Sequence, residues 1–228
     1  MNQLSLNLIA ITIFTLVMSS LLGPLVHLSP AVPAVVMASI LGLATIDTWS
    51  FQGQGRALLL DSLARFSPDH RDRVIRHEAG HFLAALLLDI PVTGYTLSAW
   101  EAWRQGQVGA GGVSFDTTAI EAEIAGGTIS TQTIDRLCTV WMAGVAAEDL
   151  VYGAAEGGAD DRAKLVLLWQ QLRRPLTEAQ LKARWAALQA KALLETHRSA
   201  YDALVEAMQN RAPVQDCVAI VANLTATL

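Results

Sequence analysis

The first 46 residues contain no Asp, Glu, Lys or Arg, and the first charged residue is Asp47. Two apolar runs lie in this stretch, from Leu4 to Val26 and from Ala31 to Ile46, the second extendable to Trp49. A membrane-spanning helix needs about 20 mainly apolar residues. We therefore expect residues 1–50 to be a membrane anchor, a hairpin of two transmembrane helices in the lipid bilayer. Because the second run is short, one span followed by an interfacial or re-entrant helix is the alternative.

The charges that flank the anchor predict its orientation. No basic residue precedes Asp47, and five arginines follow the second run: Arg56, Arg65, Arg71, Arg73 and Arg76. Basic residues tend to stay on the cytoplasmic side. The C-terminal domain is therefore expected on the cytoplasmic side, or on the stromal side in a plastid. A cleaved signal peptide is not favoured, because Met1-Asn2-Gln3 offers no basic segment before the apolar run.

The composition limits the remaining possibilities. The 228 residues carry a net charge of −5, which gives no reason to expect nucleic acid as a partner. The two cysteines, Cys138 and Cys217, lie in apolar helical patterns without a CxxC neighbour. Both are expected to be buried thiols rather than metal ligands or half-cystines.

The anchor is followed by a linker and then by one folded domain. Gly53-Gln54-Gly55 is typical of a flexible exit, and residues 57–66 predict an amphipathic helix, so 51–67 is a juxtamembrane linker. The domain covers 68–228. Its first helix is expected over 68–88, with Ser67 as N-cap and Pro91 after its end.

The rest of the domain is expected to be mostly helical. Residues 92–98 and 108–115 resemble strands, with AWEAWRQGQ as a turn or loop between them. A short helix over IEAEIAGG, a helix capped by Ser130, and a glycine-rich loop follow. The next helix opens at Asp160-Asp161 and breaks at Pro175. Thr177 is then expected to cap a helical region to about Asn210, before a last helix over 213–225. This is a mainly α fold with a small β-sheet.

The HEAGH segment carries the clearest chemical signal. His77 and His81 are four residues apart, so on a helix both side chains lie on one face. Two neutral imidazoles at that spacing can bind one Zn²⁺ ion. Glu78, on the same helix, is placed to take a proton from a water that the ion activates. The pattern predicts the metal ligands and catalytic base of a zinc hydrolase.

A catalytic zinc site needs a third protein ligand. The best candidates are the carboxylates of EGGADD, Asp160 and Asp161, because a glycine-rich loop allows a close approach and the next helix then projects the carboxylate. The residues alone leave open which aspartate it is.

Four segments together resemble the peptidase domain of the FtsH-type zinc metallopeptidases. RVIRHEAGHFLAALLL resembles their zinc helix, WMAGVAAEDLVYG their small-residue helix, and LLETHRSAYDALVEAM a late helix; EGGADD aligns without a gap on Thr-Gly-Ala-Ser-Asn-Asp. The resemblance covers about residues 68–225 and implies a helical zinc-metallopeptidase domain with Asp161 as third ligand. Glu156 in place of Thr and Asp160 in place of Asn are departures that bear on the choice between Asp160 and Asp161.

These 228 residues contain no GxxxxGK[ST] motif and no Gly-Lys pair. The chain therefore resembles the short, ATPase-free membrane relatives of FtsH found in photosynthetic lineages. The resemblance implies a membrane-anchored, ATP-independent zinc metalloendopeptidase that cleaves unfolded or membrane-associated polypeptides. Its partners would be those polypeptides, the lipid bilayer, and a second copy of the chain or an FtsH-type ATPase.

Two other functions compete with this one. A catalytically silent scaffold or assembly factor could keep the fold and partner a full FtsH complex. HEAGHFLAALLL also resembles the zinc helix of site-2-type intramembrane proteases. The charged SPDHRDRVIR segment before it does not fit inside lipid.

Other residues have expected supporting roles. Glu148 is either a partner of a ligand histidine or an ordinary surface or capping residue. Gly80 is expected to permit close packing against the helix over 133–152. Trp100 and Trp103 are expected to pack or to lie at an interface, with a substrate groove as the alternative. Two histidines outside the motif, His70 and His197, are expected to be solvent-exposed.

Overall fold

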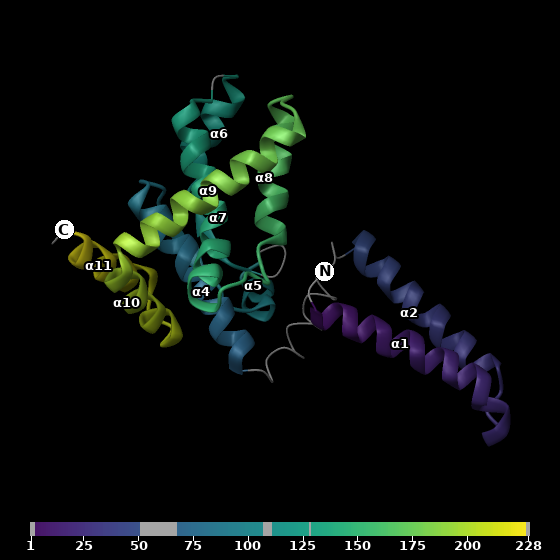
Figure 1. The fold of residues 1–228 in the computed structure, drawn as a ribbon. Coiled ribbons are helices and arrows are strands. Elements are labelled where there is room, and N and C mark those ends of the chain that lie inside the picture. Colours follow the sequence, from purple (N-terminus) through teal and green to yellow (C-terminus); the bar gives the residue numbers. More distant parts are fainter. Residues whose placement is uncertain (1–2, 51–67, 107–110, 128, 227–228) are drawn as a thin grey trace. The chain divides into compact units, whose positions relative to one another are not determined.

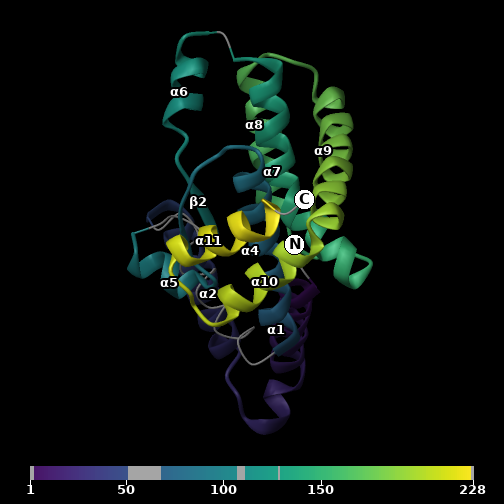
Figure 2. The same cartoon turned by 90° about the vertical axis from the view of Figure 1, so that its left-hand side faces the viewer.

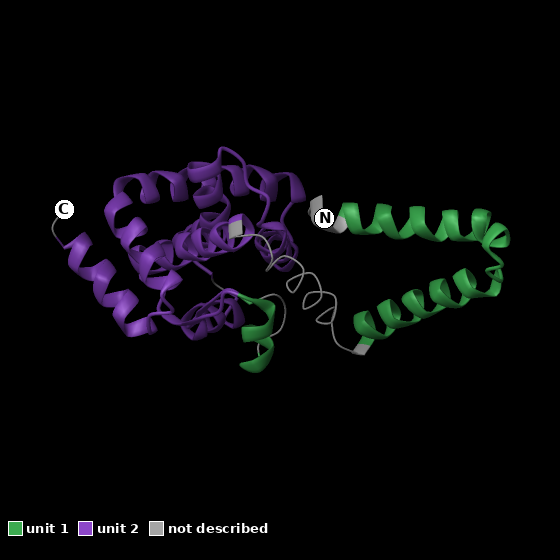
Figure 3. Ribbon diagram, turned by 90° about the horizontal axis from the view of Figure 1, so that it is seen from below, with its two compact units in different colours: residues 1–66, 98–111 green, residues 67–97, 112–228 purple. Residues whose placement is uncertain are grey.

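The computed structural model describes residues 3–50, 68–106, 111–127 and 129–226. It is mainly helical, with one two-stranded sheet in the described part, as the sequence predicts. The chain divides into two compact units (Figure 3): residues 1–66 with 98–111, and residues 67–97 with 112–228. The expected amphipathic helix over 57–66 and the expected cap at Ser67 lie outside the described residues.

The first unit contains the charge-free N-terminus. Helix α1 (Gln3–Leu22) runs into a 3-10 turn, η1 (Gly23–Val26), and α2 (Ala31–Ser50) returns. The reversal is closed by the Leu28 N–H, which donates to Gly23 O at 2.8 Å. The stretches Leu6–Val26 and Ala31–Trp49 have mean hydropathies of 2.1 and 1.7, and their side chains are mostly exposed. By length and composition, both helices can cross a membrane.

The same unit contains α5 (Ala99–Arg104), so the expected turn or loop at AWEAWRQGQ is wrong for its first six residues. Ser98 explains the helix, because its extended backbone and its Oγ, which accepts from Glu101 N at 3.2 Å, make an N-cap. The exposed rings of Trp100 and Trp103 lie on α5 with their centroids 4.9 Å apart.

The second unit is built on α7 (Thr131–Tyr152). Both α4 (Pro68–Leu87) and α9 (Leu176–Thr196) pack against α7, as Figures 1 and 2 show. The remaining helices are α6 (Thr118–Ala125), α8 (Ala159–Gln171), α10 (Arg198–Gln209) and α11 (Val214–Thr225). The core lies among α4, α7, α10 and α11, with Phe82, Leu83, Tyr201 and Leu204 fully buried.

The small sheet pairs β1 (Val92–Tyr95) with β2 (Val113–Phe115) in antiparallel register, Val92 opposite Phe115, with an irregularity before Gly94. Both strands are shorter than expected, and residues 108–110 of the expected second strand lie outside the described residues. Beyond the strands, Thr96 still pairs with Gly112: its N–H donates to Gly112 O at 3.0 Å, and its Oγ1 accepts from Gly112 N at 3.0 Å.

The helix ends test the expected caps. Ser130 caps α7 as predicted, accepting from Thr133 N at 3.0 Å, and Gly153 ends α7 at φ 75°. Thr177 is not the cap of α9; Pro175 holds the extended N-cap position and Thr177 lies in the first turn. The expected continuous helical region to Asn210 is also interrupted, because the backbone leaves helical geometry at His197 between α9 and α10.

Gly80 lets α4 and α7 cross closely, as predicted. A Cβ built on Gly80 would lie 2.6 Å from Ala143 O and 2.8 Å from Ala147 Cβ. Both atoms belong to the α7 backbone or its shortest side chains, so neither can move aside alone. The crossing distance is therefore set by the absence of one methyl group.

We predict that Gly80→Ala destabilises the domain, because the helices must separate to admit the methyl group. Overpacking of this kind costs about 1–3 kcal/mol, which lowers Tm by roughly 2–10 °C for a chain of this size. Thermal unfolding followed by circular dichroism measures it. Gly94→Ala is the control, since its Cβ would meet nothing closer than Ser114 Cβ at 4.0 Å. An unchanged Tm for Gly80→Ala would show that the distance between α4 and α7 does not depend on the glycine.

Candidate metal centre

Helix α4 brings His77 and His81 onto one buried face, where only 9% and 5% of each residue's surface is exposed. The Nδ1 atom of His81 lies 2.7 Å from Val140 O, and the Nδ1 atom of His77 lies 2.7 Å from Glu148 Oε1. A carbonyl oxygen only accepts hydrogen bonds, so Nδ1 of His81 carries the proton. Both rings are thus held by Nδ1, and both Nε2 atoms face the same point, 3.0 Å apart.

The first turn of α8 brings a carboxylate to that point. Asp161 is buried, and its Oδ2 lies 3.2 Å from His77 Nε2 and 3.4 Å from His81 Nε2. Asp160, its neighbour, is exposed on the outer side of the helix. Gly158, at φ 81°, makes the sharp entry into α8 that directs Asp161 inward.

The three atoms fit one small cation. A neutral imidazole whose Nδ1 carries the proton has a lone pair at Nε2. When both histidines are in this form, the three converging atoms, two Nε2 and one carboxylate oxygen, are all electron-pair donors and none carries a proton. Zinc bound tetrahedrally at about 2.0–2.1 Å would hold its ligand atoms about 3.3 Å apart. The separations found are 3.0, 3.2 and 3.4 Å. The buried His77, His81 and Asp161 can therefore hold a metal ion.

Gly144 of α7 leaves the room for that ion. A Cβ built on Gly144 would lie 2.5 Å from His81 Nε2 and would also collide with His77 Nε2. The side chain of any other residue would fill the point where the three ligand atoms meet. Sequence reasoning missed Gly144, although its place in a helix of small residues is a usable signal.

Glu148 links the two halves of the site. Besides His77 Nδ1, this carboxylate accepts from Arg73 Nη1 at 3.0 Å, from Glu156 N at 2.9 Å and from Gly157 N at 3.1 Å. Only 1% of the residue is exposed. The structure thus decides between the two roles considered for Glu148: it orients His77 and also fixes the loop that leads to Asp161. Arg73, one turn before His77, was missed by sequence reasoning.

The charges of the site shift its pKa values strongly. Burial acts to lower the pKa of His77, but hydrogen bonds with Asp161 and Glu148 raise it to about 10. Burial acts to raise the pKa of Glu148, but hydrogen bonds with His77, Glu156 N and Arg73 lower it to about 2. The pKa of Asp161 is also held far below its ordinary value against its burial. Without a metal, the pocket therefore holds a proton on His77 between two carboxylates.

Glu78 lies beside this pocket and faces the sheet. Its Oε2 accepts from Val113 N, the first residue of β2, at 3.0 Å. Its charge contributes to the raised pKa of His77, so the two groups are electrostatically close. Gly112, at φ 134°, allows the strand to approach, because a Cβ there would lie 3.2 Å from Glu78 Oε2. The backbone of the strand thus comes close to Glu78 at Gly112.

Lys164 holds the oxygen of Asp161 that does not face the histidines. Its Nζ lies 3.0 Å from Oδ1, one helical turn further along α8. This ion pair, which sequence reasoning missed, leaves Oδ2 as the oxygen that points to His77 and His81. Asp161 therefore turns one oxygen, Oδ2, toward the two histidines.

The remaining candidates do not join the site. His70 and His197 are half-buried rather than exposed as expected, and Nδ1 of His197 is buried without a hydrogen-bond partner in the described part of the chain. Trp100 and Trp103 belong to the other compact unit. Cys138 and Cys217 are free and buried, as predicted.

No protein-family model matches this chain, and no curated protein sequence matches it. The geometry of these side chains is therefore the basis for proposing a function.

We predict that Asp161→Asn removes most of the bound metal and that Asp160→Asn does not. A neutral carboxamide at position 161 would be a much weaker ligand than the carboxylate, whereas residue 160 is on the exposed side of α8. The metal content of both purified variants, measured by elemental analysis, tests this. Loss of metal in the Asp160 variant alone would reverse the assignment.

We predict that the affinity for Zn²⁺ rises about tenfold per pH unit between pH 6.5 and 8.5, because the ion must displace one proton from His77. The raised pKa of His77, about 10, keeps that proton bound throughout this range. An ordinary histidine, with a pKa of about 6.5, would give a plateau above pH 7. Competition with a chelator at three pH values measures the slope. Glu148→Gln should make the slope shallower, because it removes one of the groups that raise the pKa of His77. A plateau above pH 7 in the wild type would contradict the prediction.

Proposed function

We propose that this chain is a membrane-anchored, ATP-independent zinc metalloendopeptidase that cleaves unfolded or membrane-associated polypeptides. The observation that carries the proposal is the convergence of His77 Nε2, His81 Nε2 and Asp161 Oδ2 beside Glu78, which lies on the same helix as both histidines. Three protein ligands are the number that leaves one position of a tetrahedral ion open for chemistry.

The ligand types favour zinc. Two imidazole nitrogens and one carboxylate oxygen resemble the His₂-carboxylate sets of zinc peptidases, and zinc binds both kinds of donor. The ligands are ordered before the metal arrives, through Glu148, Val140 O and Lys164. Such orientation of ligands by their outer partners typically contributes 10–100-fold to metal affinity.

The chain's own residues supply the proton transfers. A zinc ion in this site would act as a Lewis acid toward a water molecule and the scissile carbonyl. Glu78 would accept the proton of the attacking water and give it to the leaving amine. Its Oε2 is fixed by Val113 N–H, while Oε1 makes no hydrogen bond within the described part of the chain.

The substrate would be an extended peptide along β2. Val113 N–H donates to Glu78 rather than to β1, so this edge of β2 faces the glutamate. A peptide that adds to the free edge of a strand is held by main-chain hydrogen bonds, which do not depend on its sequence. This arrangement supports broad cleavage of chains that are already unfolded.

The structure also bears on the intramembrane alternative. The candidate metal centre lies in the second unit, and no described helix of that unit is long and apolar enough to be a candidate span. A peptidase at the membrane surface is therefore the better proposal. A silent scaffold would bind metal without cleaving, so the experiments below separate it from an enzyme.

We predict that Glu78→Gln retains zinc but loses peptidase activity by a factor of about 10²–10⁴, the usual contribution of general base catalysis. The amide keeps the size of the side chain but cannot accept the proton. Digestion of casein, with elemental analysis of the same preparation, tests both parts. Retention of more than about a tenth of the activity would show that Glu78 is not the base. Inactivity of the metal-loaded wild type would favour the scaffold.

We predict that the isolated protein cleaves a destabilised mutant of a small domain faster than its stable parent, with no effect of ATP. The chain has no Gly-Lys pair and hence no phosphate-binding loop of the Walker type. A stable domain must open spontaneously, at a free energy of about 5–15 kcal/mol, before a peptide can reach the site. Cleavage rates with and without ATP measure this. Equal rates for both substrates, or a strict need for ATP, would contradict it.

A further inference from the structure

Helix α9 is apolar on two opposite faces. One face packs into the core of the second unit through Ala179, Ala186, Ala190 and Leu194. The other face exposes Leu181, Trp185 and Leu188, at 64%, 38% and 66% of their surface. These three are spaced i, i+4, i+7 and so form one stripe along the outside of the helix. Neither the metal ligands nor Glu78 involves this stripe.

Basic residues surround the stripe. Residues 172–194 contain five basic residues and one acidic residue, Glu178, a local charge of +4 in a chain whose net charge is −5. The five are Arg173, Arg174, Lys182, Arg184 and Lys191. Lys182 and Lys191 form ion pairs with Asp135 and Asp149, whereas Arg173, Arg174 and Arg184 are exposed. Set against the exposed carboxylates of Glu178 and Glu195, these three arginines leave the surface with a small net positive charge.

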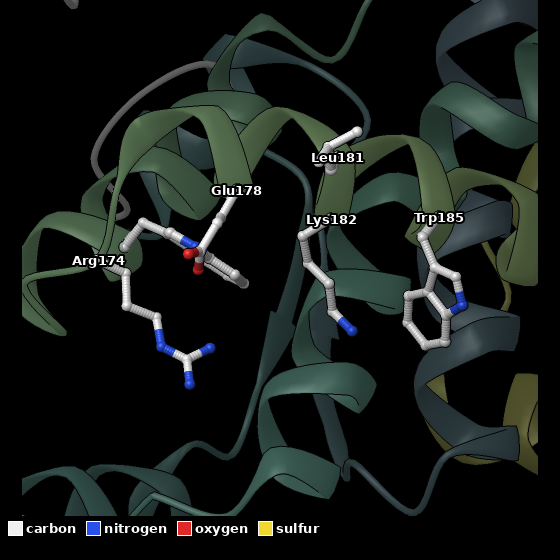
Figure 4. Close-up of a pocket in the computed structure, with 6 residues that line it drawn as sticks. Arg174, Glu178, Leu181, Lys182 and Trp185 are labelled. Atoms are coloured by element: carbon white, nitrogen blue, oxygen red, sulfur yellow. The ribbon is translucent and has the colours of Figure 1, made fainter.

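An open pocket of about 320 Å³ lies at the start of the stripe, as Figure 4 shows. It is lined by Trp169, Arg174, Glu178, Leu181, Lys182 and Trp185. The ammonium of Lys182 lies 3.6 Å from the centroid of the Trp185 ring. Arg174 and Lys182, the latter paired with Asp135, outnumber the one lining carboxylate of Glu178, so the pocket combines a small positive charge with apolar surface, which suits a ligand with an anionic head and an apolar body.

We propose that the outer face of α9 lies on the membrane surface and binds anionic phospholipid. Leu and Trp on one side of a helix, with Arg and Lys beside them, are the pattern of helices that lie in the bilayer interface. The phosphate of a headgroup would lie at Arg174 and Lys182, while Leu181, Trp185 and Leu188 would reach the acyl boundary. The two candidate spans of the same chain supply the bilayer.

The charge of the face disfavours a second copy as the occupant. A two-fold dimer through α9 would place the same patch on both sides of the interface. Exposed arginines would then face exposed arginines. An anionic lipid surface instead gains about 1 kcal/mol, or about fivefold in affinity, for each basic residue near it. The inference does not rest on the metal centre.

The test uses the full chain in nanodiscs with a nitroxide label at Leu188→Cys; both native thiols are buried and should not react. With phosphatidylglycerol present, the label should become more accessible to oxygen and less accessible to a water-soluble nickel chelate. The control label, Ser199→Cys on the exposed side of α10, should stay in water. Discs of phosphatidylcholine alone should show no such shift.

Arg174→Gln with Arg184→Gln should weaken the lipid contact about 30-fold, about fivefold for each charge removed, and leave the metal content unchanged. A label that stays in water in both kinds of disc would overturn the proposal. So would the same shift in both kinds of disc, because the recognised group would then not be anionic lipid. Spin–spin broadening between copies would show that a second chain covers this face.

Discussion

The buried carboxylate of Glu148 is the interaction on which the second unit's arrangement depends. One carboxylate accepts from His77 on α4, from Arg73 on the same helix, and from two backbone N–H groups of the loop before α8. A charge this deeply buried is stable only when its oxygens are fully paired. The partners must therefore be present together, and their assembly places His77 and Asp161 on the same side of α7.

Glycines provide the space that this assembly needs. Gly80 lets α4 approach α7, and Gly144 leaves open the volume where the ligand atoms converge. Gly157 plays the same part beside Glu148, since a Cβ there would lie 2.5 Å from Glu148 Oε1. The centre is thus defined as much by missing methyl groups as by the polar side chains around it. The polar groups orient the side chains of the centre, and the glycines set how closely the helices approach each other.

The sequence predicts features that local chemistry decides. The two apolar N-terminal helices, the cap at Ser130 and the i, i+4 face of His77 and His81 each depend on residues that are neighbours along the chain. Of the features that depend on tertiary contact, the close crossing at Gly80 was predicted, whereas others were left open or missed. Glu148 contacts His77, which lies 71 residues earlier in the sequence, so no local pattern predicts the pair. The break between α9 and α10 falls at His197, with no proline or glycine at that position to indicate it. Helix α5 is six residues long, too short for a periodic pattern to show.

The hydrogen bond between Val113 N–H and Glu78 Oε2 joins the strand edge to the glutamate. The position of β2 and the orientation of the Glu78 carboxylate are therefore coupled. If β2 shifts along its axis, this hydrogen bond turns the Glu78 side chain with it. In an enzyme of the proposed kind, a substrate peptide that paired with β2 in the wrong register would shift the strand and so misalign the Glu78 carboxylate. A poorly fitting substrate would then be cleaved more slowly, even if it bound with the same affinity.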